Sequence, residues 1–136
     1  MNFKLKRHTL TLCFGMFISA LLSINAVAQD LNGRWQGSLV SAQYDPITIV
    51  FNFQQADSDT TPTGTLDIPS QFRTGLPIDS IRIRDQQITV SMRSIQAEYY
   101  GTLVLADNGD VVAIEGDWNQ SGEYVPLRLE AATDPQ

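Results

Sequence analysis

Residues 46–54 read Pro-Ile-Thr-Ile-Val-Phe-Asn-Phe-Gln, and this stretch carries the clearest structural signal in the chain. Isoleucine or phenylalanine occupies positions 47, 49, 51 and 53, whereas Thr, Val and Asn occupy the positions between them. Such alternation is typical of a β-strand that buries one face, because successive side chains of a strand point to opposite sides. The stretch therefore predicts a half-buried strand.

Similar alternation marks further strands on both sides of this stretch, and loops and turns separate them. Residues 56–62 are polar and predict a loop, and residues 69–77, with two prolines and a glycine, predict an ordered loop. The register slips near Ser94-Ile95, which indicates a bulge or turn. Asn108-Gly109 predicts a hairpin with a type I′ turn, and residues 119–122 predict another turn. The remaining expected strands are 34–40, 63–68, 80–84, 88–92, 97–105, 112–118 and 124–130.

About eight short antiparallel strands at near-regular spacing predict a β-sandwich or an up-and-down barrel. Glycine lies two positions from a large apolar residue in several strands, as in Gly116-Asp117-Trp118. Small positions beside large ones on one face favour a tightly curved sheet. We therefore expect an all-β fold, a single antiparallel up-and-down β-barrel.

The N-terminus predicts an export signal. A basic head with Lys4, Lys6 and Arg7 precedes an apolar run over 10–24, and Ala26-Val27-Ala28 matches a small-x-small cleavage site. The run is shorter than the ~20 residues that a membrane span needs, and Leu12 disfavours lipidation at Cys13. We expect a cleaved signal peptide over 1–28, a barrel over 29–130, a frayed tail over 131–136, and a periplasmic or extracellular protein.

Cleavage changes the composition on which chemistry depends. Three of the nine basic residues lie in the signal, so six arginines remain against 15 acidic residues, a net charge of −9. The only Cys and the only His, Cys13 and His8, are also removed, and no Lys remains. Imidazole, thiol and Schiff-base catalysis need those residues, so we expect no enzyme and no cofactor. The acidic chain disfavours nucleic acid, and we expect no stable membrane insertion.

A few acidic residues could in principle bind a metal ion or act as paired catalytic carboxylates, but their pattern does not favour either role. Residues 57–59 and 107–110 offer oxygen ligands without the full ligand series of a calcium loop, so we expect no metal site. Glu115 and Asp117 share one strand face, and Glu98 lies on a neighbouring strand. We expect all three on the outer face as solubilising charges rather than as paired acid–base groups.

Gly33-Arg34-Trp35 is similar to the Gly-x-Trp start of lipocalins. That resemblance implies that Gly33 and Trp35 close the barrel base and that Arg128 packs over the Trp35 ring as a cation–π contact. The whole mature chain resembles a lipocalin-like module of bacterial secreted proteins, often found before α/β-hydrolase domains. The chain ends at Gln136, so we expect no hydrolase domain. The matching segments are 33–39, 64–67, 75–81, 99–103, 116–120 and 126–129.

Two functions remain open. In the first, the barrel binds a small apolar or amphipathic ligand in its lumen; in the second, the core is filled and the chain is an accessory module for a protein partner. Eight strands enclose about the space at which either outcome occurs. Tyr44, Tyr100 and Tyr124 are expected to face outward, and Phe72 either caps an open end or packs on the barrel. The hypothetical lumen residues are Trp35, Phe51, Phe53, Met92, Tyr99 and Trp118.

Overall fold

The computed structural model describes residues 29–57 and 61–133, and every structural statement below refers to these residues. The predicted signal peptide, residues 1–28, lies outside them and stays a prediction. The described chain forms strands and two short 3₁₀ helices: β1 (Gly33–Leu39), β2 (Ile47–Gln54), β3 (Thr63–Ile68), η1 (Pro69–Gln71), β4 (Arg73–Pro77), β5 (Ser80–Arg84), β6 (Gln87–Met92), η2 (Arg93–Ile95), β7 (Ala97–Leu105), β8 (Val111–Gln120) and β9 (Glu123–Ala131).

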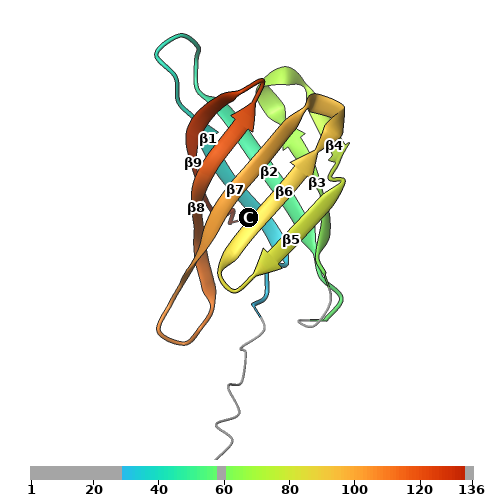
Figure 1. The fold of residues 1–136 in the computed structure, drawn as a ribbon, viewed down its shortest axis with the longest axis vertical. Helices are drawn as coiled ribbons and strands as arrows, with labels where there is room; N and C mark the ends of the chain where they lie inside the picture. The colour runs from blue at the N-terminus through green and yellow to red at the C-terminus, as the bar shows by residue number, and fades with distance from the viewer. Residues whose placement is uncertain (1–28, 58–60, 134–136) are drawn as a thin grey trace, which may run out of the picture.

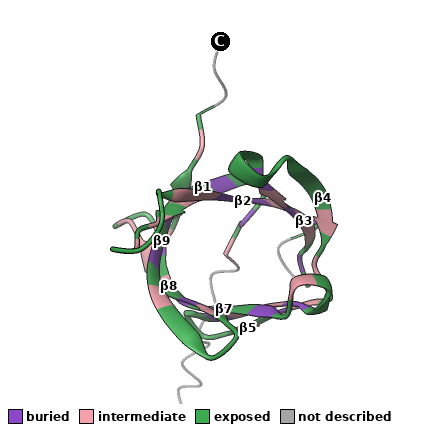
Figure 2. Ribbon diagram, turned by 90° about the horizontal axis from the view of Figure 1, so that it is seen from above, coloured by how far each residue is buried: buried purple, intermediate pink, exposed green. Residues whose placement is uncertain are grey.

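All nine strands belong to one antiparallel up-and-down sheet, in the order β4-β3-β2-β1-β9-β8-β7-β6-β5. The sheet curls through 255° around a central interior (Figures 1 and 2), which makes it a half-barrel. The predicted all-β, antiparallel up-and-down architecture is confirmed, but the sheet is an open half-barrel and not the complete barrel that we expected. Its edges are β4 and β5, which follow one another along the chain through Ile78 and Asp79. The first pairs with β3 and the second with β6, so the same stretch of chain changes partner midway and leaves the sheet open.

Strand β4 lies where the proline content predicted only a loop. Pro69 begins η1, and at the first position of a helix the backbone N–H has no acceptor within the helix, so its absence in proline costs nothing. Pro77 ends β4, which is an edge strand, so the missing donor removes no bond from the sheet interior. Both prolines are thus compatible with regular structure, and the sheet has nine strands rather than about eight.

Two hairpins of the sheet share one turn geometry. In each, a strand enters a single 3₁₀ turn and leaves through a residue with positive φ: Phe72 after η1 and Gln96 after η2, both at 53°. The backbone N–H of Phe72 donates to the carbonyl oxygen of Pro69 at 3.0 Å, and that of Gln96 donates to Arg93 at 3.1 Å. The irregularity expected near residues 94–95 is therefore the second of these 3₁₀ turns.

The turns between β7 and β8 and between β8 and β9 differ in backbone geometry from the turns that the sequence predicted. A type I′ turn needs positive φ at both central residues, but at Asn108-Gly109 only Gly109 has it, at 89°. Its N–H donates to the carbonyl oxygen of Ala106 at 2.9 Å, which gives a longer loop. Ser121 and Gly122 both have positive φ, 54° and 81°, and join β8 to β9 directly.

Glycines let neighbouring strands and large side chains approach closely inside the curved sheet. A Cβ added at Gly116 would lie 2.0 Å from the carbonyl oxygen of Tyr100, and one added at Gly37 would lie 2.0 Å from that of Arg128. At Gly101 the added atom would meet the Tyr99 ring at 2.9 Å. The pairing of glycine with large residues therefore has the packing role that the sequence pattern favoured.

Candidate functional site

The half-barrel has two different ends. Because neighbouring strands are antiparallel, the connections alternate between the ends (Figure 1). The 40–46 loop, η1, η2 and the turn at 121–122 lie at one end, which we call the open end. Residues 29–32, residues 55–57, the turn at 85–86 and the 106–110 loop lie at the other end, which we call the closed end.

The closed end is plugged by the segment that precedes β1. Leu31 is fully buried, and the indole Nε1 of Trp35 donates to the Leu31 carbonyl oxygen at 2.9 Å. The backbone N–H of Leu31 donates to Oε1 of the buried Gln55 at 3.4 Å, and Asn32 exchanges hydrogen bonds with the Gln55 backbone. Gly33 has φ of +115°, a conformation that L side chains rarely adopt, and so allows the chain to turn from the plug into β1.

Arg128 takes no part in this closure. Its guanidinium pairs with Glu115 on β8 and, at 3.0 Å, with Glu130 on its own strand, and its side chain is half exposed. Trp35 points to the buried face of β1, whereas Arg128 lies on the outer face of β9, between the buried Leu127 and Leu129. The expected stacking of Arg128 on Trp35 is therefore wrong, because strand alternation places the two side chains on opposite sides of the sheet.

The hypothetical lumen residues are all buried, and several of them pack against one another. The Phe51 ring centroid lies 5.4 Å from Phe53, 5.8 Å from Tyr99 and 6.4 Å from Trp118. The Tyr99 hydroxyl donates within the core, to the carbonyl oxygen of Leu127 at 2.9 Å or of Ile114 at 3.3 Å. These contacts fill the middle of the barrel with its own side chains. The six buried residues are Trp35, Phe51, Phe53, Met92, Tyr99 and Trp118.

A cavity of ≈ 180 Å³ remains above this packed layer, at the open end. Trp118 is the one predicted lumen residue that lines it. Its other apolar walls are Leu39, Ile47, Ile49, Ile68 and Ile95, and its polar lining is Gln71, Arg73 and Gln120. Residues from opposite sides of the curved sheet thus converge on one small space. Gln71 and Arg73 were not predicted as site residues, because residues 69–77 show no alternation that would assign them an inward and an outward face.

The polar side chains that line the open-end cavity differ in how many hydrogen bonds they make with the protein. Gln120 donates from Nε2 to the carbonyl oxygen of Ile95 at 2.9 Å and accepts from the Trp118 indole at 3.3 Å. Among the described residues, no side-chain hydrogen bond or ion pair engages the Arg73 guanidinium. Arg73, which is solvent-exposed, therefore brings a cation without a protein partner to a cavity whose lining side chains are apolar at six positions but whose accessible surface is mostly polar.

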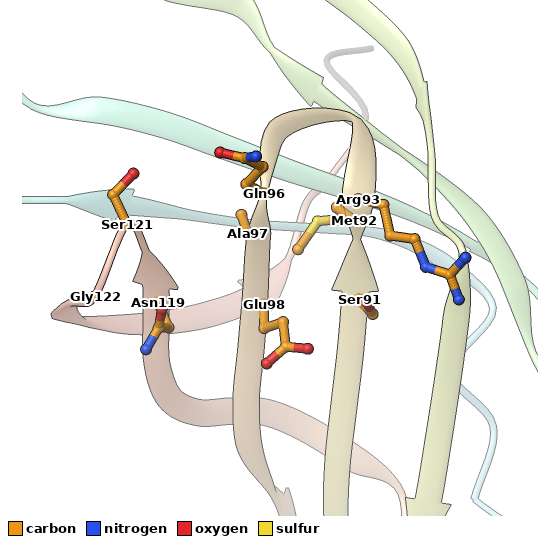
Figure 3. A pocket seen from close by; sticks show the side chains of 9 residues that line it. All are labelled: Ser91, Met92, Arg93, Gln96, Ala97, Glu98, Asn119, Ser121 and Gly122. Atoms are coloured by element: carbon orange, nitrogen blue, oxygen red, sulfur yellow. The ribbon is translucent and has the colours of Figure 1, made fainter.

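A second hollow, of ≈ 340 Å³, lies on the outer face near the same end (Figure 3). Ser91, Glu98 and Asn119 lie side by side across β6, β7 and β8 and line it. The Glu98 carboxylate already accepts a hydrogen bond from the Tyr100 hydroxyl, which raises the pKa of Tyr100. The hollow is broad and open to solvent, so it encloses a ligand less well than the smaller cavity does.

The carboxylates that the sequence singled out lie outside the open-end cavity, and one of them, Glu98, lines the outer hollow. Glu98, Glu115 and Asp117 are exposed on the outer face, as predicted. Within the described ranges, no three His, Cys, Asp or Glu side chains are grouped so that they could hold a metal ion. None of the helices in that part of the chain is long and apolar enough to cross a membrane.

Comparisons of the chain with protein-family models, with curated proteins and with solved structures find no match. The architecture itself is plain: a nine-stranded antiparallel sheet curled into an open half-barrel. The open-end cavity and the surface around it are therefore the candidate functional site.

Proposed function

We propose that this protein is a non-catalytic binding protein that holds one small amphipathic ligand at its open end. The observation that carries the proposal is the open-end cavity, on which six apolar side chains converge together with the polar groups of Gln71 and Gln120 and the Arg73 guanidinium. Apolar walls with a few placed polar groups are typical of small-molecule sites. Trp118 and the isoleucines would contact the apolar part of the ligand, and Arg73 would pair with an anionic head group.

The cavity volume limits the ligand. A dry apolar cavity of about 150 Å³ can hold benzene, so ≈ 180 Å³ accommodates an apolar group of about six to eight carbon atoms. A larger ligand would have to extend out of the open end, since Phe51, Phe53 and Tyr99 occupy the space below. The buried part of the proposed ligand is therefore short, whereas the predicted lumen could have held a longer one.

We also propose that the chain is an exported relative of the lipocalin-like barrels, in the periplasm or outside the cell. The Gly33 and Trp35 positions at the closed end support this relationship, as does the up-and-down order of the strands. The 1–28 segment supports export by its sequence pattern alone. Among the described residues there is no Cys, His or Lys, which supports a role without catalysis.

One observation favours the second candidate, an accessory module for a protein partner. The middle of the barrel is filled, and Tyr100 and Tyr124 are exposed on the outer face of β7 and β9. Tyrosines of this kind are enriched at protein interfaces. In this case the open-end cavity would be a packing irregularity, and no small molecule would bind there.

Ligand titration separates the two candidates. In a Trp35→Phe variant, Trp118 is the only tryptophan, and it lines the cavity. We expect octanoate to change its fluorescence saturably, and we expect Arg73→Gln to weaken binding about tenfold by removing a charged hydrogen bond. Arg82→Gln on the outer face of β5 is the matched control and should leave the affinity unchanged.

Native mass spectrometry of the exported protein before and after organic extraction provides the second test. A small molecule that extraction removes, and that Arg73→Gln also loses, would support the ligand proposal. An unchanged apo mass together with no saturable response to octanoate would reject it and leave the interaction module.

A further inference from the structure

Strand β5 has a neighbouring strand on one side only. It pairs with β6, and its other side faces the opening of the sheet (Figure 1). The Ser91 carbonyl oxygen of β6 accepts a hydrogen bond from the Asp79 N–H at 2.8 Å, so the backbone of Ser91 points toward β5. Because backbone groups point alternately to the two sides of an antiparallel strand, those of Ile81 and Ile83 point toward the opening. Ile83 is only half-buried, so this edge of the sheet is accessible there.

Two arginines, Arg82 and Arg84, alternate with these isoleucines and lie exposed on the outer face of β5. Their partners on β6 are uncharged, since Arg82 lies opposite Thr89 and Arg84 lies opposite Gln87. Within the described ranges, no ion pair or side-chain hydrogen bond engages either guanidinium. Both cations are therefore available to a chain that lies along the free side of β5.

The wall of the half-barrel that contains β5 is the least acidic part of the chain after the predicted signal. Residues 63–97 hold four arginines against three acidic residues, whereas residues 98–136 hold one arginine against eight acidic residues. Of the three, the Asp67 and Asp79 carboxylates each accept a hydrogen bond from a backbone N–H, at 2.7 and 2.6 Å, and Asp85 lies in the turn after β5. The free side of β5 therefore favours an acidic partner over a basic one.

A second copy of this protein is a poor occupant of this edge. If two β5 strands paired edge to edge, the arginines of one strand would lie opposite those of the other, and like charges directly opposite one another are destabilising. Charged side chains on an edge strand prevent such self-pairing. An acidic strand would instead be stabilised by the same two arginines.

We propose that β5 binds an extended segment of a partner protein as an added strand, and that acidic side chains at alternate positions of this segment pair with Arg82 and Arg84. In strand addition, main-chain hydrogen bonds provide the affinity and alternate side chains provide the specificity. The residues between the acidic ones would face the same side as the half-buried Leu76, Ile78 and Ile83, so they should be apolar. Binding of this segment requires no ligand in the open-end cavity.

Fluorescence anisotropy tests the proposal with the exported form of the protein, residues 29–136, which contains every strand of the sheet. The probe is a fluorescein-labelled peptide, Thr-Glu-Val-Glu-Val-Glu-Thr, which we expect to bind saturably. Arg82→Gln/Arg84→Gln should weaken this binding about tenfold, because two cross-strand ion pairs are lost. Arg34→Gln/Arg128→Gln lowers the net charge by the same amount on β1 and β9 and should leave the affinity unchanged.

A second peptide separates strand addition from the simple attraction of a polyanion. Thr-Glu-Pro-Glu-Pro-Glu-Thr keeps the charges and their spacing but lacks the two N–H groups that would donate to β5, so it should bind about tenfold more weakly. The Ile83 amide should exchange with deuterium more slowly when the valine peptide is bound. Arg82→Gln/Arg84→Gln should keep the urea midpoint and the octanoate affinity of the wild type, which separates this site from the open-end cavity.

Four results would overturn the proposal. Two are a lack of saturable binding and an equal affinity of the wild type and Arg82→Gln/Arg84→Gln for the valine peptide. Equal affinity for the valine and proline peptides would identify a surface for polyanions in general. A dimer of the peptide-free protein that protects the Ile83 amide from exchange would identify a second copy as the occupant.

Discussion

The indole Nε1 of Trp35 donates a hydrogen bond to the backbone carbonyl oxygen of Leu31 at 2.9 Å, and this pair closes one end of the half-barrel. Leu31 precedes the first strand, so a segment outside the sheet completes the core. The bond also satisfies the one polar atom of the indole while its ring is buried. The molecule thus has one plugged end and one open end.

Leu31→Ala should lower the free energy of unfolding by about 3 kcal/mol, because a fully buried leucine is replaced and a cavity remains. Urea unfolding followed by Trp fluorescence measures the change. Val40→Ala, at an exposed position, should cost less than about 0.5 kcal/mol. Equal effects of the two variants would contradict the role of Leu31 as a plug.

Gly116→Ala should destabilise the protein by about 3 kcal/mol or more. Its Cβ would lie 2.0 Å from the carbonyl oxygen of Tyr100 and 2.6 Å from the Cα of Gly101, so β7 and β8 would have to separate. Gly122→Ala is the comparison, since its added Cβ has open space and only the positive φ opposes it, at a cost of about 1 kcal/mol. Thermal unfolding of the two variants should rank them in this order.

Alkaline pH should destabilise the protein through Tyr99. Burial, together with the nearby Asp117 and Glu115, raises the pKa of Tyr99 above its ordinary value of 10.0. The unfolded chain therefore releases this proton first, and the free energy of unfolding should fall above pH 10 by up to about 1.4 kcal/mol per pH unit.

The Tyr99→Phe variant isolates this effect. It should be less stable at neutral pH by about 1 kcal/mol, because the hydroxyl that donates to the Leu127 carbonyl oxygen is lost. Its stability should then depend less on pH above 10 than that of the wild type. Tyr100→Phe is a useful second comparison, since the hydrogen bond to Glu98 also raises the pKa of Tyr100. A wild-type alkaline slope retained in Tyr99→Phe would exclude Tyr99 as its source.

Arg128→Ala should leave the urea midpoint of unfolding almost unchanged. Its ion pairs with Glu115 and Glu130 are solvent-exposed, and such pairs contribute little. The emission of Trp35 should not shift, because the two side chains lie on opposite faces of the sheet. A shift in Trp35 emission would indicate the stacking that the sequence comparison implied.

Strand identity followed from local alternation wherever a strand buries one face. Thr63–Ile68, Ser80–Arg84 and Ala97–Leu105 have the predicted bounds. The pattern failed over residues 73–77, where β4 is an edge strand with Pro77 at its end and only Leu76 half-buried. An edge strand at a rim buries too little of either face to show strong alternation, so its residues resemble a loop.

Local alternation also failed to reveal part of the candidate site. Alternation correctly predicted that the six lumen residues are buried, yet they belong to one hydrophobic core, and only Trp118 among them lines the open-end cavity. Arg73 and Gln71 come from the segment without a visible pattern, and they meet Ile95 from η2, over 20 residues further along the chain. No local pattern encodes such a meeting.

By itself, the sequence determined every strand except β4, the buried face of most of them, and the absence of Cys, His and Lys after the predicted signal, because each depends on residue type and near-neighbour spacing. Only the tertiary structure decided that the sheet stays open between β4 and β5, that Leu31 and Trp35 plug one end, and that exposed apolar residues surround the other. These features depend on how distant strands pair and how completely their side chains fill the space between them.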